Sequence, residues 1–391
     1  MSINIASEEA VAEVATEEPG VEPEAPEGTA KVDRDRANQW RLVWWRFRAH
    51  KLAMVGLVTI IVIYVIALLA PFLAPFSSTT FDADYIYAPP QRVHVVDDDG
   101  DWGLHALGFT LEQDPETFAL THTVNPEDRI DLGFFVRGDS YTVVGPIRWD
   151  VHLFGPTDPD RVVYLMGADR IGRDMFSMLI HGTRISMTIG LVGVALAFGL
   201  GVLLGGISGY VGGAVDTIIQ RIVEFFMSLP TLPLWLGLAA ALPQDWSSTR
   251  RYFAITIILA IIAWTDLARV VRGKFLSLRT EEFVVSARLD GSPGRRVIFR
   301  HMLPSFSSHL IASLTLSIPA MILAETSLSF LGLGLKAPTV SWGVLLEQAQ
   351  NFRVLQDAPW LLLPGVAVVI AVLSLNFVGD GLRDAADPYR A

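Results

Sequence analysis

Long stretches without charge dominate the chain. Residues 52–81, 185–215, 302–324 and 358–379 contain no Asp, Glu, Lys or Arg. The hydrocarbon core of a bilayer is about 30 Å thick, and about 20 apolar residues cross it as a helix. Each stretch is long enough to do so, and soluble domains seldom contain even one such run. The pattern therefore predicts an integral membrane protein.

The same pattern predicts an all-α polytopic fold with six transmembrane helices. We place them at about 52–76, 185–208, 222–242, 252–271, 306–333 and 359–378. Pro230 and Pro233 interrupt the third helix, and Glu325 lies inside the fifth. In the second, Gly201 and Gly205 have the four-residue spacing that lets membrane helices approach closely.

Basic residues near the helix ends predict the orientation, because Lys and Arg accumulate on the cytoplasmic side. One cluster precedes the first span: Lys31, Arg34, Arg36, Arg41, Arg46, Arg48 and Lys51. A second lies between the fourth and fifth spans: Arg272, Lys274, Arg279, Arg288, Arg295, Arg296 and Arg300. An even number of spans separates the clusters, so both face the cytoplasm, and both termini are cytoplasmic.

The loop between the first two spans is then extracytoplasmic. It is acidic, with ten Asp and Glu residues between positions 97 and 131. Its apolar segments are short and rich in β-favouring residues, as at 92–96, 132–136, 141–144 and 161–165, with turn residues between them. We expect a small β-rich insertion over residues 77–166.

Charge and composition add to the predicted division of the chain into segments. The net charge is −11, and the acid is concentrated in the first 30 residues and in the insertion. Residues 1–38 are predicted to be an acidic disordered tail, because they contain too little apolar surface to fold. Residues 39–76 are expected to hold an interfacial helix and the first span. Residues 167–391 are expected to hold the other five. The chain has no cysteine, which excludes disulfides and thiolate metal sites.

The cytoplasmic segment 280–304 carries the most informative pattern. It begins with a predicted short helix, turns at Gly291 and Pro293, continues as a second helix, and reaches Pro304 at the fifth span. Small residues on the first helix and a glycine at the turn suit docking into a groove on another protein. A basic loop that only obeys the orientation rule is the alternative. The candidate docking residues are Glu282, Phe283, Val285, Ser286, Ala287, Arg288, Asp290, Gly291 and Pro304.

This segment resembles the coupling loop of ABC importer permeases, whose pattern is Glu-Ala-Ala, three residues, Gly, and later Leu-Pro. The matching positions here are Val285, Ser286, Ala287, Gly291, Leu303 and Pro304. Val285 replaces the Glu of the pattern, and Ser286 replaces its first Ala. Segments at 167–174, 325–343 and 380–388 are similar to the second permease subunit of the dipeptide/oligopeptide family, in a long form with an enlarged outer loop.

The resemblance implies a type I ABC importer permease. Its expected partners are a second, homologous permease subunit, two ATP-binding cassette ATPases, an extracytoplasmic substrate-binding protein, the peptide substrate and membrane lipid. ATP and Mg²⁺ would bind to the ATPases, and no cofactor to this chain. The sequence agrees, because Gly273-Lys274 is followed by Phe275 and lacks the glycines of a phosphate-binding loop.

Four residues are candidates for lining a transport pathway. Ser228, Pro230 and Pro233 lie where a broken helix would free backbone carbonyls, which membranes tolerate only beside protein or a cavity. Glu325 could meet a substrate amine, or it could pair within the bundle. We expect Asp266 and Arg269 to pair with each other, since they are three residues apart on a helix.

Two other function classes remain open from the residues. A membrane-bound enzyme would need an acid/base or metal set in the acidic insertion, where the aspartates show no ligand spacing with histidine. An ion-coupled secondary transporter would work without any ATPase. Nucleic-acid binding is not expected, since orientation explains the basic clusters. Within the family, nickel, glutathione and oligosaccharides are alternative cargoes.

Overall fold

The computed structural model of the chain describes residues 39–96, 102–113, 120–144 and 147–386. The predicted acidic tail, residues 1–38, and the last five residues lie outside this range. Two units are distinguished, Met1–Leu42 and Val43–Ala391. Of the first unit, only the start of helix α2 (Gln39–Ala49) is described. All that follows concerns the second.

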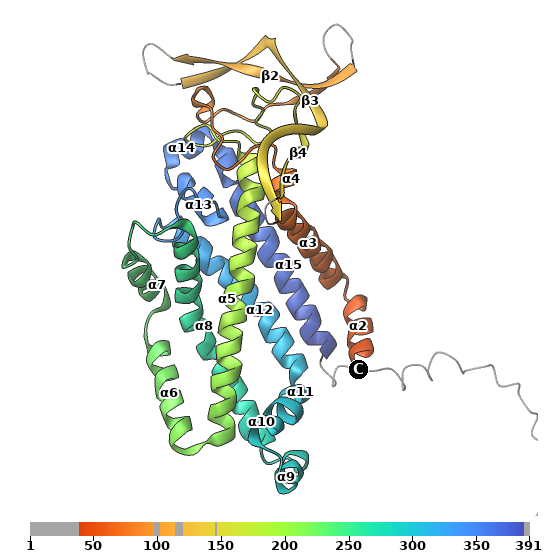
Figure 1. Cartoon of the computed structure of the whole chain (residues 1–391), viewed down its shortest axis with the longest axis vertical. Coiled ribbons are helices and arrows are strands. Elements are labelled where there is room, and N and C mark those ends of the chain that lie inside the picture. The colour runs from red at the N-terminus through yellow and green to blue at the C-terminus, as the bar shows by residue number, and fades with distance from the viewer. Residues whose placement is uncertain (1–38, 97–101, 114–119, 145–146, 387–391) are drawn as a thin grey trace, which may run out of the picture. The chain divides into compact units, whose positions relative to one another are not determined.

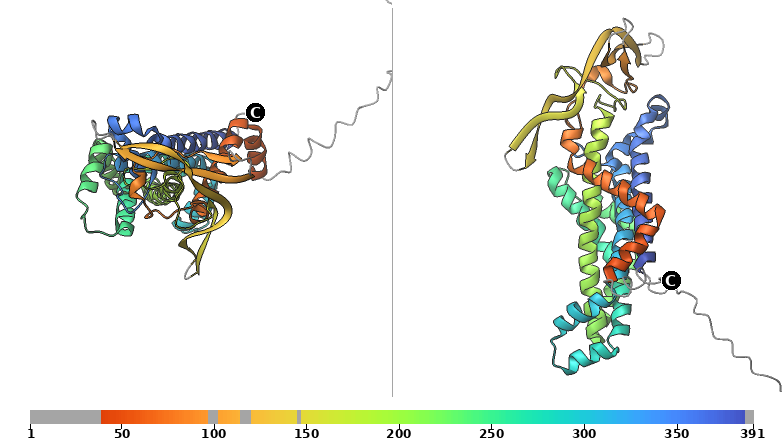
Figure 2. Two further views of the ribbon diagram at one scale, coloured as in Figure 1. Left: turned by 90° about the horizontal axis from the view of Figure 1, so that it is seen from above. Right: turned by 90° about the vertical axis from the view of Figure 1, so that its right-hand side faces the viewer.

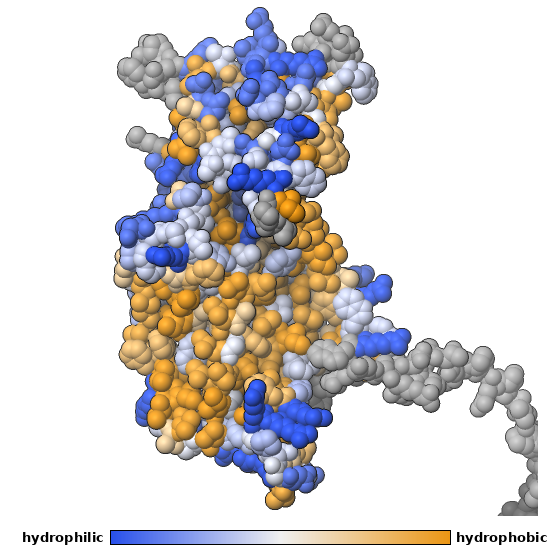
Figure 3. All heavy atoms as spheres, in the orientation of Figure 1, coloured by the Kyte–Doolittle hydropathy of each residue, from blue (hydrophilic) through white to orange (hydrophobic). Residues whose placement is uncertain are grey.

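Five helices within the described residues are long and apolar enough to cross a membrane. They are α3 (Lys51–Leu68), α5 (Met175–Val211), α8 (Ser248–Leu278), α12 (Ser307–Phe330) and α15 (Leu363–Ala386) with the short turn η4 (Pro359–Leu362) before it. They run side by side (Figure 1). Hydrophobic residues form a broad band over them, and hydrophilic residues gather at both ends (Figure 3). This distribution confirms the predicted helical membrane fold.

The predicted third span is a bent pair of helices. Helix α6 (Gly213–Ser228) and helix α7 (Thr231–Ala240) meet at an angle of 87°. The break falls at Leu229 and Pro230, as the sequence predicts. Pro233 does not break the chain, because it lies in the first turn of α7, where the missing N–H has no helical partner to lose.

Helix α5 begins ten residues before the predicted start. Its N-cap is Asp174, whose carboxylate accepts hydrogen bonds from the backbone N–H groups of Phe176 and Ser177. A carboxylate at this position satisfies donors that the first turn leaves unpaired. Hydropathy alone missed the polar first turns, which include His181 and Arg184.

A column of glycines brings α5 against α8. A Cβ at Gly205 would collide with the carbonyl oxygen of Ala268, and one at Gly209 would lie 2.7 Å from that of Arg272. A Cβ at Gly201 would lie 2.9 Å from the side chain of Leu267. The predicted role of Gly201 and Gly205 in close helix packing is therefore confirmed, and α8 is the partner.

The insertion contains an antiparallel sheet in the order β1–β2–β3–β4. Its strands are β1 (Val93–Val96), β2 (Trp102–Gln113), β3 (Leu120–Val144) and β4 (Ile147–Pro156). The predicted strand at 161–165 is absent. That segment is irregular because Tyr164 turns inward, where its ring packs against Phe76 and Tyr85.

Short elements complete both ends of the bundle. On the sheet side are α4 (Ala70–Leu73), η1 (Ala83–Tyr85), α13 (Trp342–Glu347), η3 (Gln348–Gln350) and α14 (Phe352–Asp357). At the opposite end are α9 (Glu282–Leu289), α10 (Gly294–Arg296), the π-helical turn η2 (Val297–Met302) and α11 (Leu303–Ser305). Figure 1 shows the two groups at opposite ends of α5.

The substitution Gly205→Ala tests the α5–α8 contact. We expect it to lower the stability of the purified protein by about 1–3 kcal/mol, because the added methyl group meets backbone that cannot move aside. Thermal unfolding in detergent would measure the change. Gly199→Ala is the matched control, since nothing lies within 4 Å of a Cβ at that position in the same helix. Equal unfolding temperatures for the two variants would contradict the proposed packing.

Candidate functional site

The segment predicted to dock a partner forms a helical hairpin at the end of α8. Helix α9 ends in a Schellman motif, in which Ser292 N–H donates to the Ala287 carbonyl and Gly291 N–H to that of Arg288. Gly291 has a φ of +75°, as the predicted reversal requires. No atom lies within 4 Å of a Cβ at Gly291, so backbone conformation, not space, favours glycine there.

The two faces of α9 differ in what they offer. Val284 and Ala287 are buried, whereas Phe283, Val285 and Leu289 are exposed, Leu289 to 83 %. The small side chain of Ala287 therefore serves packing within this chain, and not close approach by a partner as the sequence suggested. The remaining docking candidates, Glu282, Ser286, Arg288, Asp290, Gly291 and Pro304, are all exposed.

A second exposed surface adjoins α9. Pro293, Arg295, Arg296 and Phe299 line a hollow of about 380 Å³ at the same end of the molecule. The exposed surface of this end therefore combines apolar side chains with guanidinium groups, and such mixtures are typical of protein interfaces.

The hairpin is held to the membrane-spanning helices by a buried cluster. Val284 and Ala287 of α9 join Phe275 of α8, Met302 and Phe306 in it. The rings of Phe275 and Phe306 lie 5.8 Å apart, edge to face. Displacement of α9 must therefore move the ends of α8 and of the segment leading to α12.

A polar network fixes the same ends of α5, α6 and α8. Arg272 of α8 donates to both carboxylate oxygens of Asp216 in α6, at 2.5 and 2.7 Å. Ser208 of α5 donates to the same carboxylate at 2.5 Å, and Gln220 donates to Ser208. The sequence analysis missed this pair, because the two charges are 56 positions apart.

Helices α5, α7, α8 and α12 enclose a cavity of about 480 Å³. Its wall is mostly apolar and includes Trp235, Leu259 and Met321, with polar groups from Asp266, Ser313 and Ser317. Asp266 also pairs with Arg269 at 3.4 Å, as predicted. Ser313 and Ser317 are four residues apart, so they share one face of a predicted membrane helix. This spacing is the signal by which the sequence could have indicated the wall of the cavity.

The predicted pathway residues lie beside this cavity but do not line it. Ser228, Pro230 and Pro233 are exposed at the α6–α7 bend, and the neighbouring Thr231 contributes to the wall in their place. Ala324 lines the cavity, whereas the adjacent Glu325 points into the bundle.

Glu325 ties α12 to α13. Its Oε1 accepts hydrogen bonds from Ser329 at 2.8 Å and from Ser341 at 2.7 Å, and the residue is fully buried. The backbone N–H of Trp342 in turn donates to Ser186 of α5 at 3.0 Å. Of the two roles open to Glu325, pairing within the bundle is the one that its position supports.

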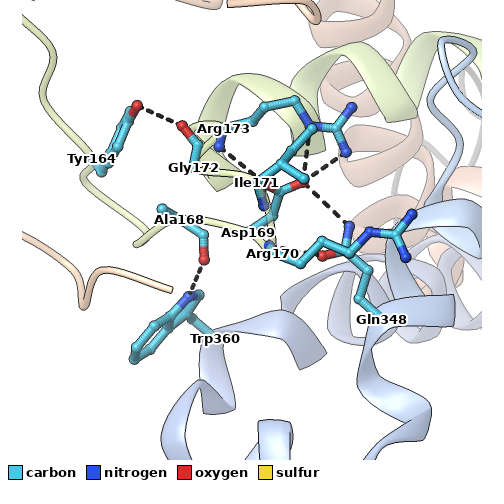
Figure 4. A network of polar contacts seen from close by, with 9 residues as sticks. All are labelled: Tyr164, Ala168, Asp169, Arg170, Ile171, Gly172, Arg173, Gln348 and Trp360. Atoms are coloured by element: carbon cyan, nitrogen blue, oxygen red, sulfur yellow. Dashed lines mark hydrogen bonds and ion pairs between the residues drawn. The ribbon is translucent and has the colours of Figure 1, made fainter. Parts of the chain in front are cut away.

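The segment 167–174 forms a clasp at the sheet side, centred on Asp169 (Figure 4). Asp169 is fully buried, and its Oδ2 accepts from Arg173 Nε at 2.9 Å and Nη2 at 2.6 Å. Gln348, which follows α13, donates to the same oxygen, and Trp360 donates to the carbonyl of Ala168 at 2.8 Å. Segments almost 200 residues apart therefore meet here.

Tyr164 connects the clasp to the insertion. Its hydroxyl donates to the carbonyl oxygen of Gly172 at 2.7 Å. Burial raises the pKa of Tyr164 above its ordinary value, and nearby carboxylates add to the effect, so the hydroxyl keeps the proton that it donates. The sheet, the start of α5 and the segment before α15 are joined through this one motif.

These features define a polytopic membrane protein with a helical hairpin at one end of its bundle and a sheet at the other. The family described as "binding-protein-dependent transport system inner membrane component" matches residues 201–390. The family described as "N-terminal TM domain of oligopeptide transport permease C" matches residues 38–90. The two matches cover both sides of the insertion.

Three permeases of other organisms are similar to this chain. A putative peptide permease protein of Brucella ovis is 39 % identical over 61 % of this chain and 78 % of its own length. The dipeptide transport system permease protein DppC of Haemophilus influenzae is 30 % identical, over 88 % of this chain and 93 % of its own. The oligopeptide transport system permease protein OppC of Bacillus subtilis is 29 % identical over 92 % of both chains. This chain belongs to the oligopeptide/dipeptide permease family of ABC importers.

Removing one charge from the clasp should be costly. We expect Asp169→Ala to destabilise the protein by about 3–5 kcal/mol, because it leaves the Arg173 guanidinium buried without a counter-charge. Thermal unfolding would measure the loss. The double variant Asp169→Ala/Arg173→Met should recover part of it, since no isolated charge remains.

An exposed ion pair supplies the control for the clasp. Arg129 and Asp131 of the insertion lie 2.8 Å apart, with side chains 38 % and 60 % exposed. Asp131→Ala should change stability by no more than about 1 kcal/mol, because solvent already screens that pair. Similar losses for the two single variants would show that the clasp is not a special anchor.

Proposed function

We propose that this chain is one of two permease subunits that form the translocation pathway of a peptide importer. A homologous permease would complete the pathway, two ATP-binding cassette ATPases would dock on the helical hairpins, and a substrate-binding protein would deliver cargo at the sheet side. ATP and Mg²⁺ would be bound by the ATPases alone. Among the described residues, no group of three or more His, Asp or Glu side chains could hold a metal ion.

The observation that carries the proposal is the exposure of three large apolar side chains on α9. Helix α9 lies at the end of the bundle opposite the sheet (Figure 1), and this chain leaves Phe283, Val285 and Leu289 exposed there. A groove in a partner protein would remove these side chains from water, at about 25 cal/mol per Å² of apolar area. Val285, which stands where the family pattern has Glu, would make this contact an apolar one.

The packing supports a lever mechanism. Helix α9 is continuous with α8 through a short turn, and the buried cluster joins it to the segment before α12. Both α8 and α12 line the cavity of about 480 Å³. Movement of a docked ATPase would therefore shift two walls of the cavity together, which is how a nucleotide-driven equilibrium could alternate access.

The cavity is our candidate for the half of the pathway that this chain supplies. Its apolar wall would tolerate varied side chains, and Asp266 would offer a carboxylate to a peptide amino terminus or a basic side chain. Di- or oligopeptide cargo is supported by the relatives named above, whose own names refer to peptides. Nickel, glutathione or oligosaccharide cargo would need metal-ligating or more polar walls.

The orientation follows from charge. The docking end carries Arg295, Arg296 and Arg300 among its exposed residues, whereas the insertion is acidic. We therefore place the docking hairpin and both termini in the cytoplasm and the sheet outside, in the bacterial inner membrane. The sheet would then meet the binding protein.

Substitutions at Gly291 separate the docking geometry from insertion into the membrane. We expect Gly291→Val to abolish most peptide-stimulated ATPase activity and uptake, because a β-branched residue at φ +75° costs about 1–2 kcal/mol and unwinds the end of α9. Gly291→Asn should retain most activity, since Asn tolerates this conformation. Uptake and ATPase activity in proteoliposomes would be measured for both. Full coupling in Gly291→Val would contradict the docking role.

Crosslinking tests the same contact directly. The natural chain has no cysteine, so Leu289→Cys is the single reactive thiol in the permease. We expect a bifunctional thiol reagent to join it to an ATPase subunit, with a yield that changes on addition of nucleotide. Trp102→Cys on β2 is the control, because it lies on the opposite side. Failure of Leu289→Cys to reach an ATPase, or reaction of that thiol from outside intact cells, would overturn the proposal.

A further inference from the structure

The strands β3 and β4 extend beyond the sheet as a hairpin with its own attachment to the helices. Residues 132–144 of β3 pair with β4. We call residues 132–144 of β3, together with β4, the lateral hairpin. In the right-hand view of Figure 2 the paired strands descend from the sheet toward the height of the nearby helix ends, at one side of the bundle. Asp139 anchors it, accepting hydrogen bonds from Ser77 N–H at 2.9 Å and from Thr80 Oγ1 at 2.5 Å.

The attachment places the lateral hairpin at the boundary of the membrane. Helix α3 has 18 residues, most of them apolar, and a helix of this length crosses most of the hydrocarbon core, so its end at Leu68 marks the boundary. Helix α4 follows directly. The ring of Phe72 in α4 lies 6.4 Å from the ring of Phe135 in the hairpin. Leu68 and Leu69 are exposed, and the apolar surface therefore continues from the span onto the hairpin.

Two adjacent aromatic rings of the hairpin both face outward. Side chains that follow each other along a strand normally point to opposite faces. Phe134 and Phe135 are nevertheless 63 % and 67 % exposed. Phe135 has a φ of +56°, an uncommon conformation for a bulky residue, although the pairing of β3 with β4 keeps its register there. Backbone strain at an exposed aromatic residue has no benefit for folding, so it indicates a surface that something else covers.

The other exposed residues of the hairpin show which kind of partner fits. Ile147 and Trp149 on β4 are exposed, as are Arg137 and Arg148. Asp139 is occupied by Ser77 and Thr80. Aromatic rings interleaved with arginines are typical of segments at the headgroup level of a bilayer, where rings lie at the interface and guanidinium groups meet phosphate.

The charge of the hairpin contrasts with the rest of the insertion. Acidic residues predominate elsewhere in the insertion, among them Glu112, Glu127, Asp128, Asp158 and Asp160. An acidic surface is repelled by anionic lipid, whereas the exposed charged side chains of the hairpin are Arg137 and Arg148, and its carboxylates, Asp139 and Asp150, are part-buried. The distribution of charge and the depth of the attachment therefore agree.

We propose that the lateral hairpin rests on the phospholipid interface at the sheet side of the membrane. Phe134, Phe135, Ile147 and Trp149 insert at headgroup level, and Arg137 and Arg148 contact lipid phosphates. The insertion is thereby held at two places, by the clasp above the helices and by lipid beside them. This fixes the tilt of the sheet over the pathway, whatever cargo the importer carries.

Site-directed probes in the assembled importer test this contact. Single variants Phe135→Cys, Trp149→Cys and Trp102→Cys would each carry a fluorescent label, in nanodiscs with and without lipids bearing a nitroxide at the headgroup. Trp102 is 83 % exposed on β2, away from the helix ends, and serves as the control. We expect the nitroxide lipid to quench the labels at 135 and 149 severalfold more than the label at 102. An aqueous quencher should show the reverse order.

Each other outcome identifies a different occupant. Labels at 135 and 149 that respond to the aqueous quencher as strongly as the label at 102 would show a free surface and overturn the proposal. Labels shielded from both quenchers would show that a protein, such as the second permease, covers the hairpin, and this would also overturn it. Phe135→Cys relies on a residue in contact with α4, so Trp149→Cys provides the independent reading if the former variant folds poorly.

Discussion

The close approach of α5 and α8 is the contact on which the rest of the structure depends. Lipid tails are as apolar as the side chains between helices, so burial alone does not hold membrane helices together. Tight packing of backbone against backbone must do so, and the glycines at 201, 205 and 209 allow it. Because α8 runs on into α9, the helix pair forms a rigid connection between the docking hairpin and the wall of the cavity. A residue larger than glycine at these positions would push α5 and α8 apart.

Polar interactions gather at the two ends of this connection. Asp216 and Arg272 join three helices at the docking end, and Asp169 and Arg173 join distant segments at the sheet side. Between them the cavity is mostly apolar, with few polar groups. The polar contacts therefore fix the two ends of the bundle, whereas apolar packing surrounds the cavity between them. Glu325 belongs to the same pattern, since its serine partners hold α13 against α12.

Patterns in the sequence correctly predicted features that depend on neighbouring residues. They did not predict what each face of a helix would contact. The Gly291 turn, the break at Pro230 and the Asp266–Arg269 pair depend on residues within a few positions of each other, and each appears as expected. Ala287 was expected to face a partner, and a substrate contact was one of the two roles open to Glu325, whereas the fold buries both residues. A helical pattern indicates which residues share a face, but not whether that face meets a partner, a cavity or another helix of the same chain.

The sequence by itself determined the membrane class, the number of apolar segments, the sheet-forming insertion and the family. These properties follow from hydropathy, β-branched runs and short motifs, each of which acts over one element. Only the tertiary structure decided that α8 is the partner of the α5 glycines, that Asp169 and Gln348 meet, and that the ring of Phe135 lies near that of Phe72. These contacts join residues far apart in the chain, and no periodic pattern in the sequence encodes them.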